Sequence, residues 1–177
     1  MTRRLFIFDE PDRFVPGTVG EPGERTFYLQ ARKGRAVVSV VIEKSQVAVL
    51  AARMTELLST VDRPPPAFQP IGDDAPLDEP LVEVFRVGAM ALAWDPSVEQ
   101  VMIEAQTEEA GGEYLEVADD DDAGPDLMRV RLAPEQAHAF VGLAERLVAG
   151  GRPTCPYCGE PLDPAGHFCA RSMGLLN

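Results

Sequence analysis

The chain has 177 residues, and its 29 acidic side chains outnumber the 16 basic ones, which gives a formal net charge of −13. This charge opposes broad binding to nucleic acids or anionic membranes, because neutralising phosphates requires clustered lysines and arginines. Hydrophobic residues make up 45% of the chain, enough for the core of one ordinary domain. No apolar stretch approaches the roughly 18 residues of a membrane-spanning helix. We therefore expect neither nucleic acid nor a membrane among the partners.

The first half of the chain carries the patterns of four strands. In one run, Phe27, Leu29 and Ala31 alternate with polar residues, and this period of two is typical of a half-buried strand. Another run is β-branched and apolar almost throughout, which predicts a central strand. The predicted strands cover residues 4–9, 14–19, 25–32 and 36–43.

A helix, a linker and a second set of elements follow. Apolar residues recur at helical spacing from residue 44 to residue 61, which predicts an amphipathic helix. Residues 63–80 hold six prolines and four acidic residues, which is typical of a linker or surface loop. The second half then predicts strands over residues 85–94, 98–107 and 127–132, and a helix over residues 134–149.

The two halves resemble each other. Adding 90 to the apolar positions of the first helix gives those of the second, and TFYLQAR matches QVMIEAQ at an offset of 74. Neither half offers enough apolar area to fold alone, so we expect both to share one core. The predicted fold class is α+β: two βββα-like repeats that share a mainly antiparallel sheet, with a leading strand and two helices on one side.

All three cysteines and one of the two histidines lie within fifteen residues near the C-terminus, spaced C-x2-C-x8-H-x-C. Three thiolates and an imidazole form a complete ligand set for one tetrahedral zinc ion. The first two cysteines can point inward from one tight turn, and Gly159 permits a positive φ directly after them. We predict a zinc knuckle or ribbon that holds a structural Zn²⁺ through Cys155, Cys158, His167 and Cys169.

The H-x-C pair leaves the fourth ligand open at this stage. Common zinc fingers carry C-x2-C or H-x3–5-H in their second half, so an H-x-C pair is an unusual spacing for two ligands of one ion. Asp163 is the alternative ligand. A redox CxxC pair and a catalytic zinc are the other interpretations, but four protein ligands leave no position for a substrate water. The pattern therefore favours a structural ion that folds the tail.

Cysteine usage also bears on location and organisation. Three cysteines cannot all pair with one another, and CxxC spacing in a reducing compartment is typical of metal or redox chemistry. The N-terminal apolar run stops at Asp9, too short for a secretory signal, so we expect a cytoplasmic protein.

The predicted organisation is a first unit with its leading strand over residues 1–62, a linker over 63–80, a second unit over 81–150 and a zinc-binding tail over 151–177.

Two classes of function remain open. One is a non-catalytic binding or adaptor protein with an unknown protein partner, because no catalytic constellation accompanies the metal site; His138 has no nucleophile motif beside it and predicts a surface or boundary position. The other is an enzyme or binder of a small anion such as phosphate. Its cleft between the halves would be lined by Arg13, Arg25, Gln30, Arg32 or Glu43. The alternation of these arginines with Asp9 and Asp12 favours cross-strand ion pairs over such a pocket.

Several motifs together resemble a known family. They are D-x-P-D-R-F-V-x-G-T-V-G at residues 9–20, R-T-F-x-L-Q-A-R at 25–32, E-K-x-Q-V at 43–47 and CPYCGEPLDPAGHFC at 155–169. The combination is similar to a conserved hypothetical family of actinobacteria, a domain of unknown function, over essentially the whole chain. The resemblance supports the architecture and the zinc site and implies no established activity.

Overall fold

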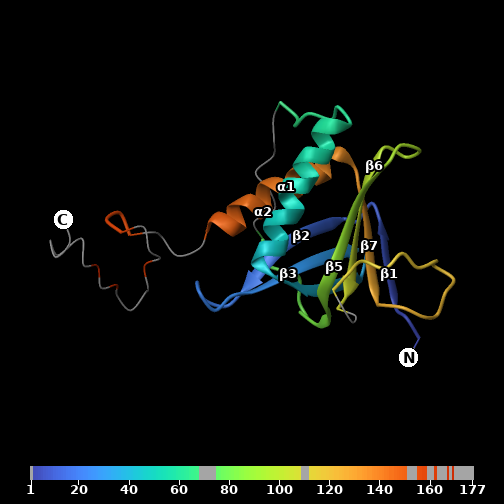
Figure 1. Ribbon diagram of the computed structural model, residues 1–177, viewed down its shortest axis with the longest axis horizontal. Helices are drawn as coiled ribbons and strands as arrows, with labels where there is room; N and C mark the ends of the chain where they lie inside the picture. The colour runs from blue at the N-terminus through green and yellow to red at the C-terminus, as the bar shows by residue number, and fades with distance from the viewer. Residues whose placement is uncertain are drawn as a thin grey trace.

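The computed structural model describes residues 2–67, 75–108, 112–150, 155–158, 162, 167 and 169. Seven strands and two helices follow one another within the described residues (Figure 1). The strands are β1 (Leu5–Asp9), β2 (Arg13–Val19), β3 (Thr26–Lys33), β4 (Ala36–Ile42), β5 (Glu83–Asp95), β6 (Gln100–Thr107) and β7 (Leu127–Leu132). The helices are α1 (Lys44–Thr60) and α2 (Pro134–Ala149).

One sheet contains all of these strands, in the order β1-β7-β6-β5-β4-β3-β2. The strands β2, β3 and β4 form an antiparallel meander, and β5, β6 and β7 form another. The two meanders join where β4 pairs with β5 in parallel, an arrangement that needs a long crossover, and α1 lies within it. Both helices lie against the same face of the sheet (Figure 1). We call the opposite face the outer face.

The two edge strands of the sheet are close neighbours in the sequence. Strand β1 ends at Asp9 and β2 begins at Arg13, yet they occupy opposite edges. Figure 1 shows β2 and β3 running across the direction of β7 and β1, as expected for a strongly twisted sheet. This twist brings the end of β1 towards β3, where the Lys33 ammonium donates a hydrogen bond to the backbone carbonyl of Asp9.

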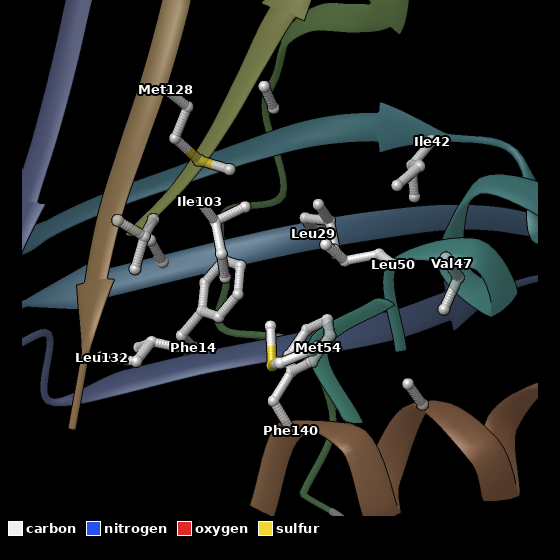
Figure 2. Close-up of a cluster of buried hydrophobic side chains, with 14 of the residues drawn as sticks. Phe14, Leu29, Ile42, Val47, Leu50, Met54, Ile103, Met128, Leu132 and Phe140 are labelled. Atoms are coloured by element: carbon white, nitrogen blue, oxygen red, sulfur yellow. The ribbon is translucent and has the colours of Figure 1, made fainter. Parts of the chain in front are cut away.

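A single hydrophobic core lies between the sheet and the helices. The predicted apolar stripes supply it, because Met54 of α1 and Phe140 of α2 are almost completely buried. The ring of Phe140 stacks on that of Phe14 from β2, with 5.0 Å between the ring centroids (Figure 2). Leu29 of β3 and Ile103 of β6 point into the same cluster (Figure 2). Side chains from both halves therefore form one continuous core.

The observed elements confirm a mixed α+β fold, with helix and strand bounds within about two residues of the prediction. The order of three strands and a helix occurs twice after β1, which is compatible with the internal repeat. Both helices also begin in the same way. The side-chain oxygens of Gln46 and Gln136 accept hydrogen bonds from the backbone N–H groups of Glu43 and Ala133, three residues earlier. The repeat itself stays a prediction. Among the described residues, no helix is long and apolar enough to cross a membrane.

Candidate metal centre

The clearest candidate site is built by the C-terminal cysteines and histidine. Cys155 starts a tight turn that continues through Cys158, as the CxxC spacing predicts. One ligand atom from each of Cys155, Cys158, His167 and Cys169 can be chosen so that all four lie within 4.8 Å of one another. Cys155 and Cys169 are each 5% exposed, and the other two are half-buried. The structure thus brings together the four predicted ligands.

Their spacing suits one tetrahedral ion. Four ligands about 2.1–2.3 Å from a zinc ion lie roughly 3.4–3.8 Å from each other. The Cys158 Sγ and His167 Nε2 atoms are 3.2 Å apart, close to that separation. His167 and Cys169 each contribute a ligand atom to this cluster although one residue separates them in the sequence. The alternative ligand Asp163 lies outside the described residues.

The donor set limits what this centre could do. Thiolates and a neutral imidazole are soft and borderline ligands, so the cluster could bind a metal ion of the zinc type. None of the three cysteines, all of which the structure describes, forms a disulfide. An ion held by four protein ligands has no vacant position at which water or substrate could be activated. An ion bound by all four residues would therefore form a closed centre.

Three of the five predicted ligand-binding residues lie together, but they contact the protein itself. Arg13, whose side chain is 6% exposed, donates hydrogen bonds to the backbone carbonyls of Ala75 (2.7 Å) and Pro76 (3.1 Å). Its guanidinium also pairs with the Asp78 carboxylate at 3.2 Å, and Arg32 pairs with the same carboxylate at 3.0 Å. The two arginines thus hold the loop that precedes β5 against the outer face of the sheet.

Gln30 completes this attachment, which we call the loop clamp. Its side-chain oxygen accepts a hydrogen bond from the Asp78 backbone N–H at 2.7 Å, and its amide nitrogen donates to the Asp78 carbonyl at 3.1 Å. The same nitrogen lies 3.0 Å from the Ser39 hydroxyl on β4. Gln30 is 1% exposed, so its polar atoms need these partners. The polar pattern of β3 therefore serves to fix a loop.

Arg25 and Glu43 lie elsewhere. Arg25 donates a 3.0 Å hydrogen bond to the carbonyl of Gly150, at the end of α2. Glu43 pairs with Arg86 of β5 at 2.8 Å, with both side chains more than half exposed. The structure therefore divides the five predicted residues among a loop clamp, a helix end and a surface ion pair.

A second buried network on the outer face had not been predicted. Glu104 of β6 is 4% exposed, and it accepts hydrogen bonds from the Tyr114 hydroxyl and the Arg129 guanidinium. Arg129 also makes bidentate hydrogen bonds to Asp119, at 2.7 and 2.9 Å. These bonds hold the pKa of Asp119 below its ordinary value, whereas burial and the hydrogen bond to Glu104 raise the pKa of Tyr114 to about 12. The sequence does contain a signal for this network, because Glu104 and Arg129 are charged residues within otherwise apolar strands.

Surface cavities lie where the halves meet, and two of them contain charged residues of interest. One, of about 380 Å³, is lined by residues of both helices and includes Arg63, His138 and Glu145. His138 is 9% exposed, and its Nε2–H donates to the Arg63 carbonyl at 2.9 Å, which agrees with a boundary role. The other, of about 370 Å³, lies between β2 and the end of α2 and is lined in part by Arg25 and Arg146.

The chain belongs to the family described as "Protein of unknown function (DUF3090)", whose model matches residues 6–169. The matched region contains every described strand and helix apart from the first residue of β1, together with the whole Cys/His cluster. This confirms the resemblance drawn from the motifs. The family description names no source organism, so the actinobacterial origin stays a prediction. No curated protein and no solved structure matches the chain.

Proposed function

Starting from membership of a family without an assigned activity, we propose that this is a non-catalytic binding or adaptor protein. Its C-terminal segment would be folded around one structural zinc ion. The observation that carries the proposal is the convergence of three thiols and an imidazole within 4.8 Å. Zinc is the ion that such a closed Cys3His set suits best, and binding it would stabilise a segment too short to fold alone.

The environment of the ligands supports a partner-binding role. Tyr157 lies between the first two candidate ligands, and its side chain is 62% exposed. Exposed tyrosines often contribute to protein interfaces, because their rings are amphipathic. A turn fixed by a metal ion would hold this ring in one orientation at little entropic cost. Within the described residues, the buried charged side chains of the sheet contact one another or the backbone, which supports structural roles for them. We propose that the unknown protein partner contacts Tyr157.

The proposal has a metal part and a partner part, which can be tested separately. Metal analysis of the purified chain should find one zinc per molecule, and the Cys155→Ser variant should lose it. Limited proteolysis should then cut the tail of the variant first while the core stays intact. A wild-type chain without zinc and with a Cys155–Cys158 disulfide would refute the metal site.

The partner part is tested by affinity capture from an extract of the source cells, followed by mass spectrometry. A partner recovered with the wild type should be lost with Tyr157→Ala and retained with Val98→Ala, which truncates a similarly exposed side chain in the β5–β6 turn. Equal recovery with both variants would show that Tyr157 is not the contact.

The organisation and location of the chain belong to the same proposal. We propose that residues 1–62 and 81–150 descend from one duplicated βββα unit, joined by the linker 63–80 and followed by the tail 151–177. The doubled order of elements and the matching Gln46 and Gln136 contacts support this. Reduced cysteines held by zinc would suit the cytoplasm.

A small-anion binder is the second candidate, and one cavity favours it. The cavity between β2 and α2 is lined in part by Arg25 and Arg146, which bring two guanidinium groups to one hollow of a strongly acidic chain. Leu143 and Leu147 provide an apolar wall. Such a lining suits a small organic anion with an apolar body.

Titration calorimetry with phenyl phosphate would test this second candidate. Binding should weaken at least about tenfold, or about 1.4 kcal/mol, in Arg25→Gln. It should not change in Arg53→Gln, which alters an exposed arginine on α1 that pairs with Glu56. Absence of binding to the wild type would exclude phenyl phosphate as a ligand of this cavity and leave the metal proposal unaffected.

A further inference from the structure

The two edges of the sheet differ in how the sequence protects them. An unpaired edge strand offers free N–H and C=O groups to any other strand, and proteins usually block it with proline or charge. Strand β2 carries Pro16 in its middle. Strand β1 reads Leu-Phe-Ile-Phe-Asp, with neither proline nor charge before its last residue. Ile7, at its centre, is 45% exposed.

The hydrogen-bond phase of β1 shows which backbone groups are available. The Arg4 carbonyl accepts from Leu127 and the Glu10 N–H donates to Arg131, so even-numbered residues face β7. The backbone groups of Leu5 and Ile7 must then face away from the sheet. No hydrogen bond from the rest of the described chain reaches the backbone groups of Leu5 and Ile7, whereas the outward carbonyl of Asp9 accepts one from the Lys33 ammonium.

We propose that β1 is a self-association surface, on which β1 of a second copy of this chain pairs antiparallel about a two-fold axis at Ile7. Outward-facing residues must lie opposite each other to form hydrogen bonds, and an axis through Ile7 satisfies this condition. The two Ile7 residues then exchange both of their backbone hydrogen bonds. The Asp9 N–H of each copy faces the Leu5 carbonyl of the other. The pairing joins two sheets into one continuous sheet.

The charges of the segment favour a second copy as the occupant. Residues 3–10 read Arg-Arg-Leu-Phe-Ile-Phe-Asp-Glu, basic at the start, acidic at the end and neutral in total. With the axis at Ile7, the exposed Arg4 of one copy, which also pairs with Asp126, lies opposite the exposed Glu10 of the other, which also accepts a hydrogen bond from Gln100. The net charge of −13 makes two copies repel each other over most of their surface. The segment 3–10 is neutral, so pairing through β1 adds no repulsion. The segment is thus complementary to itself.

The expected dimer is small and reversible, because one short edge strand buries less surface than a permanent interface does. Sedimentation velocity over a concentration series should show a monomer–dimer equilibrium in the micromolar range. Ile7→Lys places like charges opposite each other across the axis and should raise the dissociation constant at least about tenfold. Ile7→Pro removes an outward N–H that β7 does not use, and should have a similar effect.

Val19→Lys is the matched control, because Val19 is 50% exposed on the opposite edge strand. It should leave the dimer unchanged, and thermal melting should show that all three variants remain folded. Hydrogen–deuterium exchange provides a readout without substitution: exchange of residues 5–9 should slow as the protein concentration rises. A wild type that stays monomeric up to about 1 mM would overturn the proposal. A dimer that resists both Ile7 variants, or that weakens equally with Val19→Lys, would also overturn it.

Discussion

Arg129→Met removes the guanidinium that pairs with Glu104 on the outer face of the sheet. The Glu104 side chain is 6% exposed, so the variant keeps a carboxylate away from water with the Tyr114 hydroxyl as its neighbour. Taking one partner from a buried ion pair costs about 3–5 kcal/mol. The lost contact with Asp119, which is 50% exposed, adds at most about 1 kcal/mol. We expect the free energy of unfolding to fall by about 3–5 kcal/mol, a large share of an ordinary domain's stability.

The converse substitution should cost less. In Glu104→Leu, Arg129 keeps its two hydrogen bonds to Asp119, while Tyr114 loses a hydrogen-bond acceptor worth about 1 kcal/mol. We therefore expect a loss of about 1–2 kcal/mol. The double variant leaves no uncompensated carboxylate at position 104. Its free energy of unfolding should therefore lie at most about 1 kcal/mol below that of Glu104→Leu. A coupling energy of at least about 2 kcal/mol follows.

Urea unfolding measures these differences, with the fluorescence of Trp94, the single tryptophan, as the signal. Arg53→Met is the matched control, because it breaks an ion pair with Glu56 in which both side chains are about two-thirds exposed. That control should lose less than about 0.5 kcal/mol. Equal losses in Arg129→Met and Glu104→Leu, or strictly additive losses in the double variant, would refute the reasoning from buried charge.

Three further predictions test other parts of the fold. The pKa of Tyr114 is raised from 10.0 to about 12, so its protonated form stabilises the fold below pH 10, and this contribution is lost as the pH rises through 12. The Tyr114→Phe variant lacks this titrating group. Its urea midpoint should therefore fall less steeply than that of the wild type between pH 10 and pH 11. Gly88→Ala should lower the melting temperature more than Gly17→Ala. A new methyl group would lie 2.5 Å from the nearest atom at both positions, but that atom belongs to the backbone of Glu108 at Gly88 and to the movable side chain of Leu77 at Gly17. Phe140→Ala should lower the unfolding free energy by about 3–5 kcal/mol by removing the stack on Phe14, and a loss below about 1 kcal/mol would contradict the packing.

The local part of this fold could be predicted from the sequence because its signals are short-range. The apolar stripe of α1 and the alternation of β3 each involve residues a few positions apart, and both elements lie where these patterns put them. The CxxC turn is equally local. The four residues of the Cys/His cluster could be named because cysteine is scarce in this chain and all three cysteines lie together.

The long-range part could not be predicted in the same way. The ion pairs expected among the first-half arginines and their acidic neighbours form with other partners. Arg13 and Arg32 contact Asp78, within a proline-rich stretch that predicted a linker, and Asp9 pairs with Arg131 of β7. Alternating charge shows that ion pairs are available, but tertiary topology selects the partners. The pair of Glu104 and Arg129 could not be predicted from a local pattern, because its two members lie 25 positions apart.

The parallel pairing of β1 with β7 has a consequence for how the chain reaches its native state. Leu5 lies beside Leu127, so the first of the described strands pairs with the last of them. Closing a loop of this length costs about 4 kcal/mol in chain entropy, which local contacts cannot offset in advance. The meander β2–β3–β4 can form long before that, because its turns join neighbouring strands. During synthesis β1 therefore stays unpaired until β7 has been made, and its short apolar sequence is available to a chaperone that binds hydrophobic segments.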